Sequence, residues 1–201
     1  MTKAELALRL QNACAAVAAA EQELSDIDAR FGDADHGLTM SKIAGAISGA
    51  VSASEGGIQS MLDAAAMAVM ELNGGSAVPL WNTWLDGLQE GAAEGDEISI
   101  EGLKDMFAHA LSALEDISGA KVGDKTMMDA LIPATEAVGA YEGSDEAGLF
   151  AAAAAAAAEG AENSKNFVSK FGRAKSYGEQ TIGTPDAGAV SMACFFRGLA
   201  E

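Results

Sequence analysis

Three aspartates, Asp28, Asp33 and Asp35, lie close together in the segment DARFGDADHG. On an uninterrupted helix Asp28 and Asp35 would share a face, whereas Asp33 would point about 140° away. We expect Gly32 to break the helix, so that the three carboxylates converge from a helix end and the loop after it. Three carboxylates without a nearby cysteine describe a site for a hard divalent cation such as Mg²⁺, which would also compensate their mutual repulsion. The alternative is three solvated acids in a turn, one of which caps a helix.

The residues after the acids favour an anion. His36, Gly37, Leu38 and Thr39 open a predicted helix, whose free N–H groups and positive dipole end attract a phosphate bridged to the metal. A second small-residue turn at a helix start, which includes Ser76 and Ala77, could wrap phosphates, although many turns between helices share this pattern.

Arg173 and the segment Asp186-Ala187-Gly188 form a third element. The guanidinium group of an arginine can donate two hydrogen bonds to phosphate oxygens. Asp186 is equally well explained as the N-cap of the last helix. Both interpretations of Asp186 stay open from the sequence.

Helices must position these residues, because apolar residues recur at helical spacing along almost the whole chain and no alternating run predicts a strand. Only 5% of the 201 residues are aromatic, while 23 are glycine, which favours closely packed helices. Without an internal repeat or a linker, one all-α domain of about eight helices is the best interpretation. The predicted helices cover about 2–28, 36–53, 58–72 and 79–91, one from Ser99 to near Gly119, and three that begin after Asp124, at Ser144 and after Asp186.

Several features of these elements lead to specific expectations. Asp124 is a good N-cap, and Pro133 should kink the helix that follows it. The alanine run 151–158 should let its helix approach its neighbours closely. The long segment 164–184 contains Lys165, Lys170, Arg173 and Lys175, and loops of this length in compact domains are usually functional.

The charge of the chain excludes some partners. Its 30 acidic and 12 basic residues give a net charge of −18, so nucleic acid and anionic membranes are poor partners. Cys14 and Cys194 have no metal or redox spacing and are expected to be buried free thiols. Charged residues interrupt the apolar N-terminal segment, which argues against a signal peptide and for a cytoplasmic protein. The alanine run is too short and too weakly apolar to span a bilayer.

Four motifs resemble, in order and spacing, those of the nucleotide-binding L subunit of bacterial dihydroxyacetone kinase. They are GDADHG with Asp28 five residues before its first aspartate, GGSA-x-P, GDKTMMDAL-x-PA, and GRA followed by GE-x-x-IG-x-x-D-x-GA. The resemblance covers nearly the whole chain. It implies a barrel of eight antiparallel amphipathic helices with ADP or ATP bound at one end through two Mg²⁺ ions. By this resemblance, Asp28, Asp33 and Asp35 fall on metal ligands, and the nucleotide contacts fall on His36, Gly37, Leu38, Thr39, Ser76, Ala77, Gly119, Met127, Arg173, Asp186, Ala187 and Gly188.

The chain departs from the family pattern in two loops. The family usually has GGASGP where this chain reads GGSAVP, so the serine comes one position early and a valine replaces a glycine. In the last loop Gln180, Thr184 and Ala187 replace an arginine, a histidine and a proline. Such changes fit a relative that acts on another ketose.

The resemblance also implies a kinase that works with a separate K subunit, which binds the ketone through a histidine. This chain has only His36, already assigned to the nucleotide turn, and His109, within an apolar helix. Its task would be to present a phosphoryl group, with Arg173 stabilising the developing charge. The donor stays open between ATP and a phosphotransferase-system protein that rephosphorylates bound ADP. Two other interpretations are a non-catalytic nucleotide-binding partner of a transcription regulator and a helical scaffold with a structural Mg²⁺.

Overall fold

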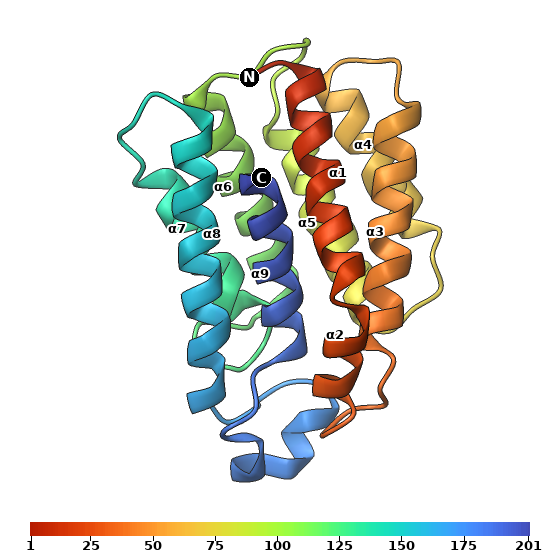
Figure 1. Ribbon diagram of the computed structural model, residues 1–201, viewed down its shortest axis with the longest axis vertical. Helices are drawn as coiled ribbons and strands as arrows, with labels where there is room; N and C mark the ends of the chain where they lie inside the picture. Colours follow the sequence, from red (N-terminus) through yellow and green to blue (C-terminus); the bar gives the residue numbers. More distant parts are fainter.

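The computed structural model describes residues 1–201 and consists of helices joined by loops (Figure 1). Its only β-type pairing is an isolated antiparallel bridge between Thr2 and Glu97. None of the helices combines the length and the apolar character that crossing a bilayer requires. The α-helices are α1 (Lys3–Ala19), α2 (Glu21–Asp28), α3 (His36–Ala53), α4 (Ile58–Met70), α5 (Ala77–Gly91), α6 (Ile100–Ser118), α7 (Met128–Gly139), α8 (Glu146–Asn163) and α9 (Ala187–Ala200), and two 3-10 helices, η1 (Ser164–Asn166) and η2 (Arg173–Thr181), lie between α8 and α9.

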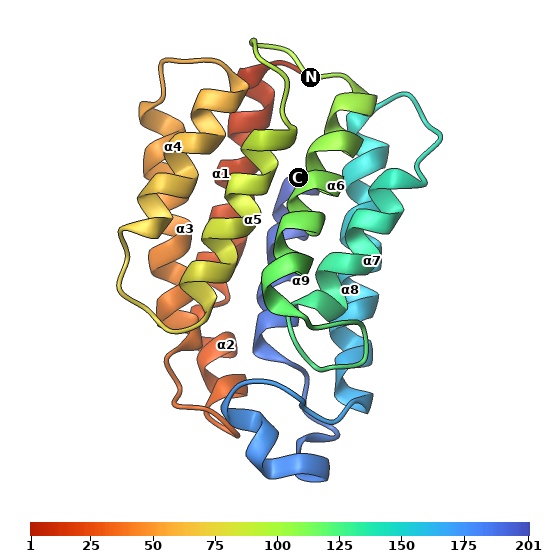
Figure 2. The same ribbon diagram turned by 180° about the vertical axis from the view of Figure 1, so that it is seen from behind.

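The helices form a closed ring in chain order. From α3 to α9 each helix packs against the next, and α1 closes the ring by lying between α3 and α9 (Figure 1 and Figure 2). Apart from α1 and α2, which both run toward the same end of the barrel, consecutive helices run in opposite directions. Because α1 and α2 follow each other around a bend, the ring contains eight rods. The predicted all-α barrel of about eight antiparallel helices is therefore confirmed.

The interior of the barrel is a packed core. Forty-eight buried apolar residues form one contiguous cluster. At its centre the ring centroid of Trp81 lies 5.2 Å from that of Phe195 and 5.5 Å from that of Trp84, in edge-to-face geometries that aromatic pairs prefer. These few large side chains fill the space that the small residues of the helix walls leave.

The alanine-rich helix α8 packs closely, as predicted. Ala153 and Ala157 are fully buried on its inner face. One turn later, a Cβ atom on Gly160 would lie 2.0 Å from the carbonyl oxygen of Asp129 in α7. The backbones of α7 and α8 therefore approach to a distance that only glycine allows at this position.

Helix ends agree with several of the sequence signals. Ser99, Asp145 and Asp186 are N-caps whose side chains accept hydrogen bonds from backbone N–H groups. Gly119 ends α6 with φ +62°, a left-handed conformation that favours glycine. Thr2 caps α1 in the same way, so at the end of the barrel where α1, α4, α6 and α8 begin, three of the four helix starts carry a side-chain cap.

Three expectations differ from the structure. The predicted helix over 2–28 is interrupted at Ala20, whose N–H donates to the carbonyl of Val17, three residues back. Asp124 is not an N-cap, because its carboxylate accepts from the backbone N–H of Lys121 and pairs with Lys170. Helix α7 begins at Met128 instead. The helices predicted over 58–72 and 79–91 are observed at 58–70 and 77–91.

Pro133 lies inside α7, which continues through it to Gly139. Both cysteines are buried and unpaired, as expected.

Candidate functional site

A cleft of about 440 Å³ lies at the end of the barrel where α2 stops and α3, α5, α7 and α9 begin. Concave sites of this size are the usual place for a small ligand. The loop segments before α5, before α7 and before α9 contribute to its wall. The residues predicted for the site that line this cleft are Asp28, Asp33, Asp35, His36, Thr39, Ser76, Ala77, Met127, Arg173, Asp186, Ala187 and Gly188.

Three predicted residues lie outside the lining of the cleft. Gly37 is buried at the contact of α3 with α2, where a Cβ atom would lie 1.9 Å from the carbonyl oxygen of Glu21. Leu38 is exposed on the outer side of the first turn of α3. Gly119 forms the C-cap of α6. At these positions the structure gives each residue a packing, surface or capping role.

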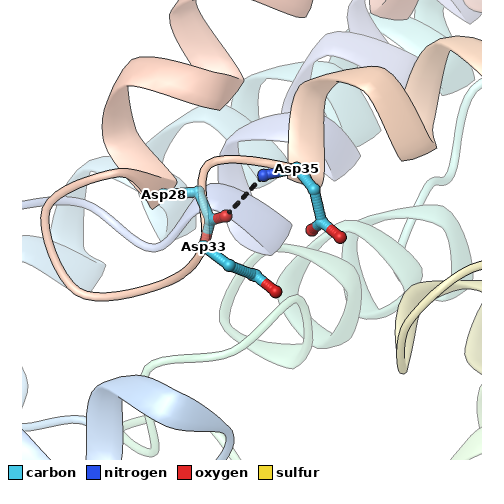
Figure 3. A group of neighbouring side chains, drawn as sticks. All are labelled: Asp28, Asp33 and Asp35. Carbon is cyan, nitrogen blue, oxygen red and sulfur yellow. Dashed lines mark hydrogen bonds between the residues drawn. The ribbon is translucent and has the colours of Figure 1, made fainter.

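The three aspartates come together from two elements (Figure 3). Asp28 is the last residue of α2, and Asp33 and Asp35 follow in the turn before α3. One carboxylate oxygen from each lies within 4.8 Å of the others. The backbone N–H of Asp35 donates to Oδ2 of Asp28 at 3.2 Å, so the turn folds back onto the helix end.

Gly32 and Ala34 give this turn its shape. A Cβ atom on Gly32 would lie 2.0 Å from Oδ1 of Asp28, so a larger residue would displace the carboxylate. Ala34 has φ +64°, an uncommon conformation for a residue with a side chain. The predicted helix break is present, and the turn holds three like charges together in a strained conformation. Strain of this kind is characteristic of functional sites.

Arg173 faces the acids from the opposite side of the cleft. It is the first residue of η2, and its Nη2 atom lies 2.7 Å from Oδ2 of Asp33. Both side chains remain partly exposed, at 72% for Arg173 and 38% for Asp33, so the pair is open to solvent and easily exchanged. The guanidinium group can therefore turn to another anion in the cleft.

Two of the helices that begin at the cleft have open N-termini. Asp35 and Ser76 precede α3 and α5, and neither side chain makes a capping hydrogen bond. The first N–H groups of these helices thus point toward the cleft without a side-chain acceptor. Together with the positive end of each helix dipole, they favour a bound anion.

His36, the first residue of α3, contacts Ser191 of α9. Its Nε2 atom lies 3.3 Å from Oγ of Ser191, and that hydroxyl donates to the carbonyl of Gly188. The hydroxyl oxygen therefore accepts from Nε2, which places the proton of the imidazole on this atom. Burial lowers the pKa of His36, although Asp28 and Asp35 oppose this shift.

Two groups at the floor of the cleft show the effect of burial. Burial raises the pKa of the Asp186 carboxyl to about 7, although its side chain accepts from the N–H of Ala189 at 2.8 Å. Burial also lowers the pKa of Lys125, whose Nζ atom donates to the carbonyls of Ser164 and Thr184. Lys125 lies within the motif GDKTMMDAL but has no role that its sequence context predicts.

The arrangement combines groups for a cation and for an anion. Three carboxylates provide oxygen ligands for a hard divalent cation, which would relieve their repulsion. Open helix N-termini and Arg173 provide donors for phosphate oxygens. A phosphate-bearing ligand that shares its oxygens with a metal fits both halves of the cleft. The donor set therefore fits Mg²⁺ bound together with a nucleotide.

Comparison with known proteins supports this description. The sequence model of the DAK2 domain matches residues 30–201. The chain is 40% identical over 197 residues to a D-erythrulose kinase of Mycolicibacterium smegmatis, which covers 92% of this chain and 33% of that protein. It is 28% identical over 194 residues to the ADP-binding subunit DhaL of the PEP-dependent dihydroxyacetone kinase of Escherichia coli, covering 93% of this chain and 91% of the subunit.

The fold also matches a solved structure. The dihydroxyacetone kinase of C. freundii, in complex with AMP-PNP and Mg²⁺, superposes with a TM-score of 0.73 at 24% identity and covers 98% of this chain and 33% of that one. The chain thus spans about a third of the length of the first curated relatives and of this structure. With the family match over most of its length and the four motifs gathered at one cleft, the chain belongs to the DAK2 domain family.

Proposed function

We propose that this chain is the nucleotide-binding, phosphoryl-transferring unit of a short-chain ketose kinase. The observation that carries the proposal is the cleft itself, where three carboxylates face an arginine and two open helix N-termini. The erythrulose kinase and dihydroxyacetone kinase relatives support the type of reaction. The whole chain, 1–201, would act as one nucleotide-binding domain.

Asp28, Asp33 and Asp35 would hold Mg²⁺, as two ions if the family arrangement applies. A cation held there would supply positive charge to offset the negative charge of the phosphates. The N–H groups at the starts of α3 and α5 orient the phosphates of ADP or ATP. Arg173 leaves Asp33 and donates to the phosphoryl group that is transferred, where charge develops. None of these roles requires a nucleophilic side chain.

The ketose would be held elsewhere, on a K-type subunit or domain. His36 already donates to Ser191, and His109 is exposed, with Nδ1 3.0 Å from the carbonyl oxygen of Asp105 in its own helix. Neither histidine is therefore placed to bind a ketone.

Exposed apolar side chains at the same end of the barrel as the cleft support docking of such a partner. Most of the large apolar side chains that are exposed lie at this end of the barrel, although isolated exposed residues elsewhere would be ordinary. They come from the last turns of α4 and α6, the first turn of α3 and the loops before α7 and α9. These residues are Leu38, Met70, Ile117, Val122, Phe171, Tyr177 and Ile182.

We propose erythrulose as the first ketose to test and dihydroxyacetone as the second. The relative at 40% identity is a D-erythrulose kinase, and the loop substitutions at Gln180, Thr184 and Ala187 fit a ketose other than dihydroxyacetone. For the donor, ATP and a phosphotransferase-system protein both need testing, since the DhaL relative belongs to a PEP-dependent enzyme.

The decisive experiment measures sugar phosphate formed by the purified chain with and without a K-type partner. Each ketose is offered with ATP or with the phosphotransferase-system donor. We expect product only when the partner is present and at most slow nucleotide hydrolysis without it. Rapid phosphorylation by the isolated chain would place the ketose on this chain, and no product with any partner or donor would refute the proposed function.

A further inference from the structure

The loop 164–186 carries two site residues into the cleft, Arg173 near its middle and Asp186 at its end. It crosses the open end of the barrel between α8 and α9 (Figure 1, blue segment at the bottom). A loop of this length needs fixed ends if the arginine is to keep its place. We call residues 164–165 and 183–186, where the loop leaves and rejoins the barrel, its neck.

Lys125 joins the two sides of the neck. Its Nζ atom donates to the carbonyl of Ser164 at 2.7 Å and to the carbonyl of Thr184 at 2.5 Å. These carbonyls are 20 residues apart in the sequence. One ammonium group therefore closes the loop like a cross-link, through two hydrogen bonds of the charge-assisted kind.

Two further hydrogen bonds close the neck without Lys125. The backbone N–H of Asp186 donates to Oγ of Ser164 at 2.9 Å, and that hydroxyl donates to the carbonyl of Ala161 in α8. The N–H of Gly183 donates to the carbonyl of Lys165 at 2.7 Å. The neck is thus tied at several points. Arg30 also reaches it, with Nη1 donating to Oγ1 of Thr184 at 3.3 Å, but Lys125 is the group from another part of the chain that bonds both sides.

The position of Lys125 is unusual for a lysine. Its side chain is buried, with 4% of the residue exposed, and its backbone has φ +60°. Lysines are rarely buried unless paired, and residues with side chains are rarely left-handed. Asp129 and Asp186 are the acidic groups that act on it. A buried charge in a strained backbone conformation indicates a requirement beyond packing.

The residue before Lys125 fastens the same loop from outside. The carbonyl of Asp124 accepts from the backbone N–H of Lys170 at 3.1 Å, and its carboxylate pairs with Nζ of Lys170 at 2.5 Å. The turn 121–127 therefore holds the loop at two places. Lys125 holds it at the neck, and Asp124 holds it at Lys170, three residues before Arg173.

We propose that Lys125 is a positioning residue, which closes the neck of the loop 164–186 and thereby fixes Arg173 opposite the acids for phosphoryl transfer. The catalytic part of this inference rests on the proposed function, whereas the closure of the neck does not. Lys125 acts through Arg173 and does not itself need to contact the phosphates.

The test compares Lys125→Met with Lys121→Met. Lys121 lies in the same turn, is exposed, and its ammonium group makes no hydrogen bond, so it controls for loss of a charge. Hydrogen exchange of the free protein reports on the neck. We expect the amides of residues 165–183 to exchange at least about tenfold faster in Lys125→Met and unchanged in Lys121→Met, because local opening governs exchange.

Kinetics with the K-type partner report on Arg173. We expect Lys125→Met to lower kcat by about 100-fold, the effect expected when a catalytic group shifts by about 1 Å. In an Arg173→Ala background the same substitution should lower kcat by less than about threefold, since residues that act through one another are not additive. A merely structural role would give independent effects that multiply.

Each outcome decides a different part of the inference. Unchanged exchange in Lys125→Met, or kinetic effects that multiply with Arg173→Ala, would overturn it. If the wild-type chain forms no sugar phosphate with any partner, the proposed function fails while the exchange result still decides whether Lys125 closes the neck. If Lys125→Met does not fold, Lys125→Gln removes the ammonium group but keeps a polar side chain, and unchanged exchange of 165–183 in that variant would also overturn the inference.

Discussion

Replacing Asp35 by asparagine should have opposite effects on the free and the ligand-bound protein. Asp35 makes no side-chain capping bond, so the substitution leaves α3 intact. In the free protein it removes one of three carboxylates whose oxygens lie within 4.8 Å. In the bound protein it removes a proposed metal ligand. We therefore expect a more stable free protein that no longer gains stability from Mg-ADP.

The expected magnitudes follow from this geometry. Arg173 already compensates Asp33, so the repulsion relieved is mainly that between Asp35 and Asp28. Two unit charges at this separation repel by about 1 kcal/mol in a water-like dielectric, which corresponds to about 2–4 °C in Tm for a chain of this size. Ligand at a hundred times its Kd stabilises a protein by about 2.7 kcal/mol, or about 5–11 °C on the same scale.

Thermal unfolding with and without saturating Mg-ADP measures both effects. Relative to wild type, Asp35→Asn should melt higher without ligand and lower with it. The control is Asp63→Asn, which removes an exposed carboxylate from α4 and should keep the full ligand shift. An equal Mg-ADP shift in Asp35→Asn and wild type would show that these carboxylates do not bind the metal.

Three further predictions test other parts of the site. Arg173→Ala should lower kcat by about 100-fold or more while weakening ADP binding far less, because transition-state charge is lost rather than ground-state binding; steady-state kinetics beside calorimetric titration measure the difference, and equal losses would argue against the role. Gly37→Ala should destabilise the protein by about 1–3 kcal/mol, since its Cβ would lie 1.9 Å from the Glu21 carbonyl, whereas Gly45→Ala, with no atom within 4 Å, should not destabilise it; denaturant unfolding of both variants checks this contrast. The pKa of Asp186 is raised to about 7 in the folded protein, which therefore binds this proton more tightly than the unfolded chain does. Its contribution to the free energy of unfolding is present below about pH 4 and is lost as pH rises to about 7. Asp186→Asn keeps an N-cap and should flatten the dependence of stability on pH between these values, and an unchanged slope would contradict the raised pKa.

The sequence was most informative where local signals decide the structure. The bounds of α3 agree with the prediction because a turn that contains Gly32 follows the end of α2 at Asp28, and the next helix starts at His36. Gly119 ended a helix as expected, because a left-handed C-cap is a local property of glycine. The all-α class followed from helical periodicity along the whole chain. The break at Ala20 has no such signal, since no glycine or proline marks it.

The candidate site was predictable as a set of residues and less so as a network. Most of the residues that the motifs predicted for the site line the cleft. Asp124 was misinterpreted as a cap because its partner, Lys170, is 46 residues away. Lys125 escaped notice because only the folded chain brings Ser164 and Thr184 to its ammonium group. Long-range polar contacts of this kind leave no periodic pattern in a sequence.

The two ends of the barrel differ in how their helices begin. At the far end, the side chains of Thr2, Ser99 and Asp145 each accept from one N–H group in the first turn of α1, α6 and α8. At the cleft, Asp35 and Ser76 leave those of α3 and α5 open. A missing side-chain cap lowers stability by about 1 kcal/mol. The free protein is therefore less stable at its cleft end than it would be if α3 and α5 were capped.

These uncapped helix starts limit how the thermal stability of the protein can be raised without loss of ligand binding. Substitutions that provide a side-chain acceptor for the first N–H groups of α3 or α5 should raise the melting temperature, as helix-capping changes commonly do. They would also occupy the N–H groups that a bound phosphate needs. A variant chosen only for its stability would therefore bind the ligand less well. Thermal robustness and ligand affinity are here competing uses of the same N–H groups.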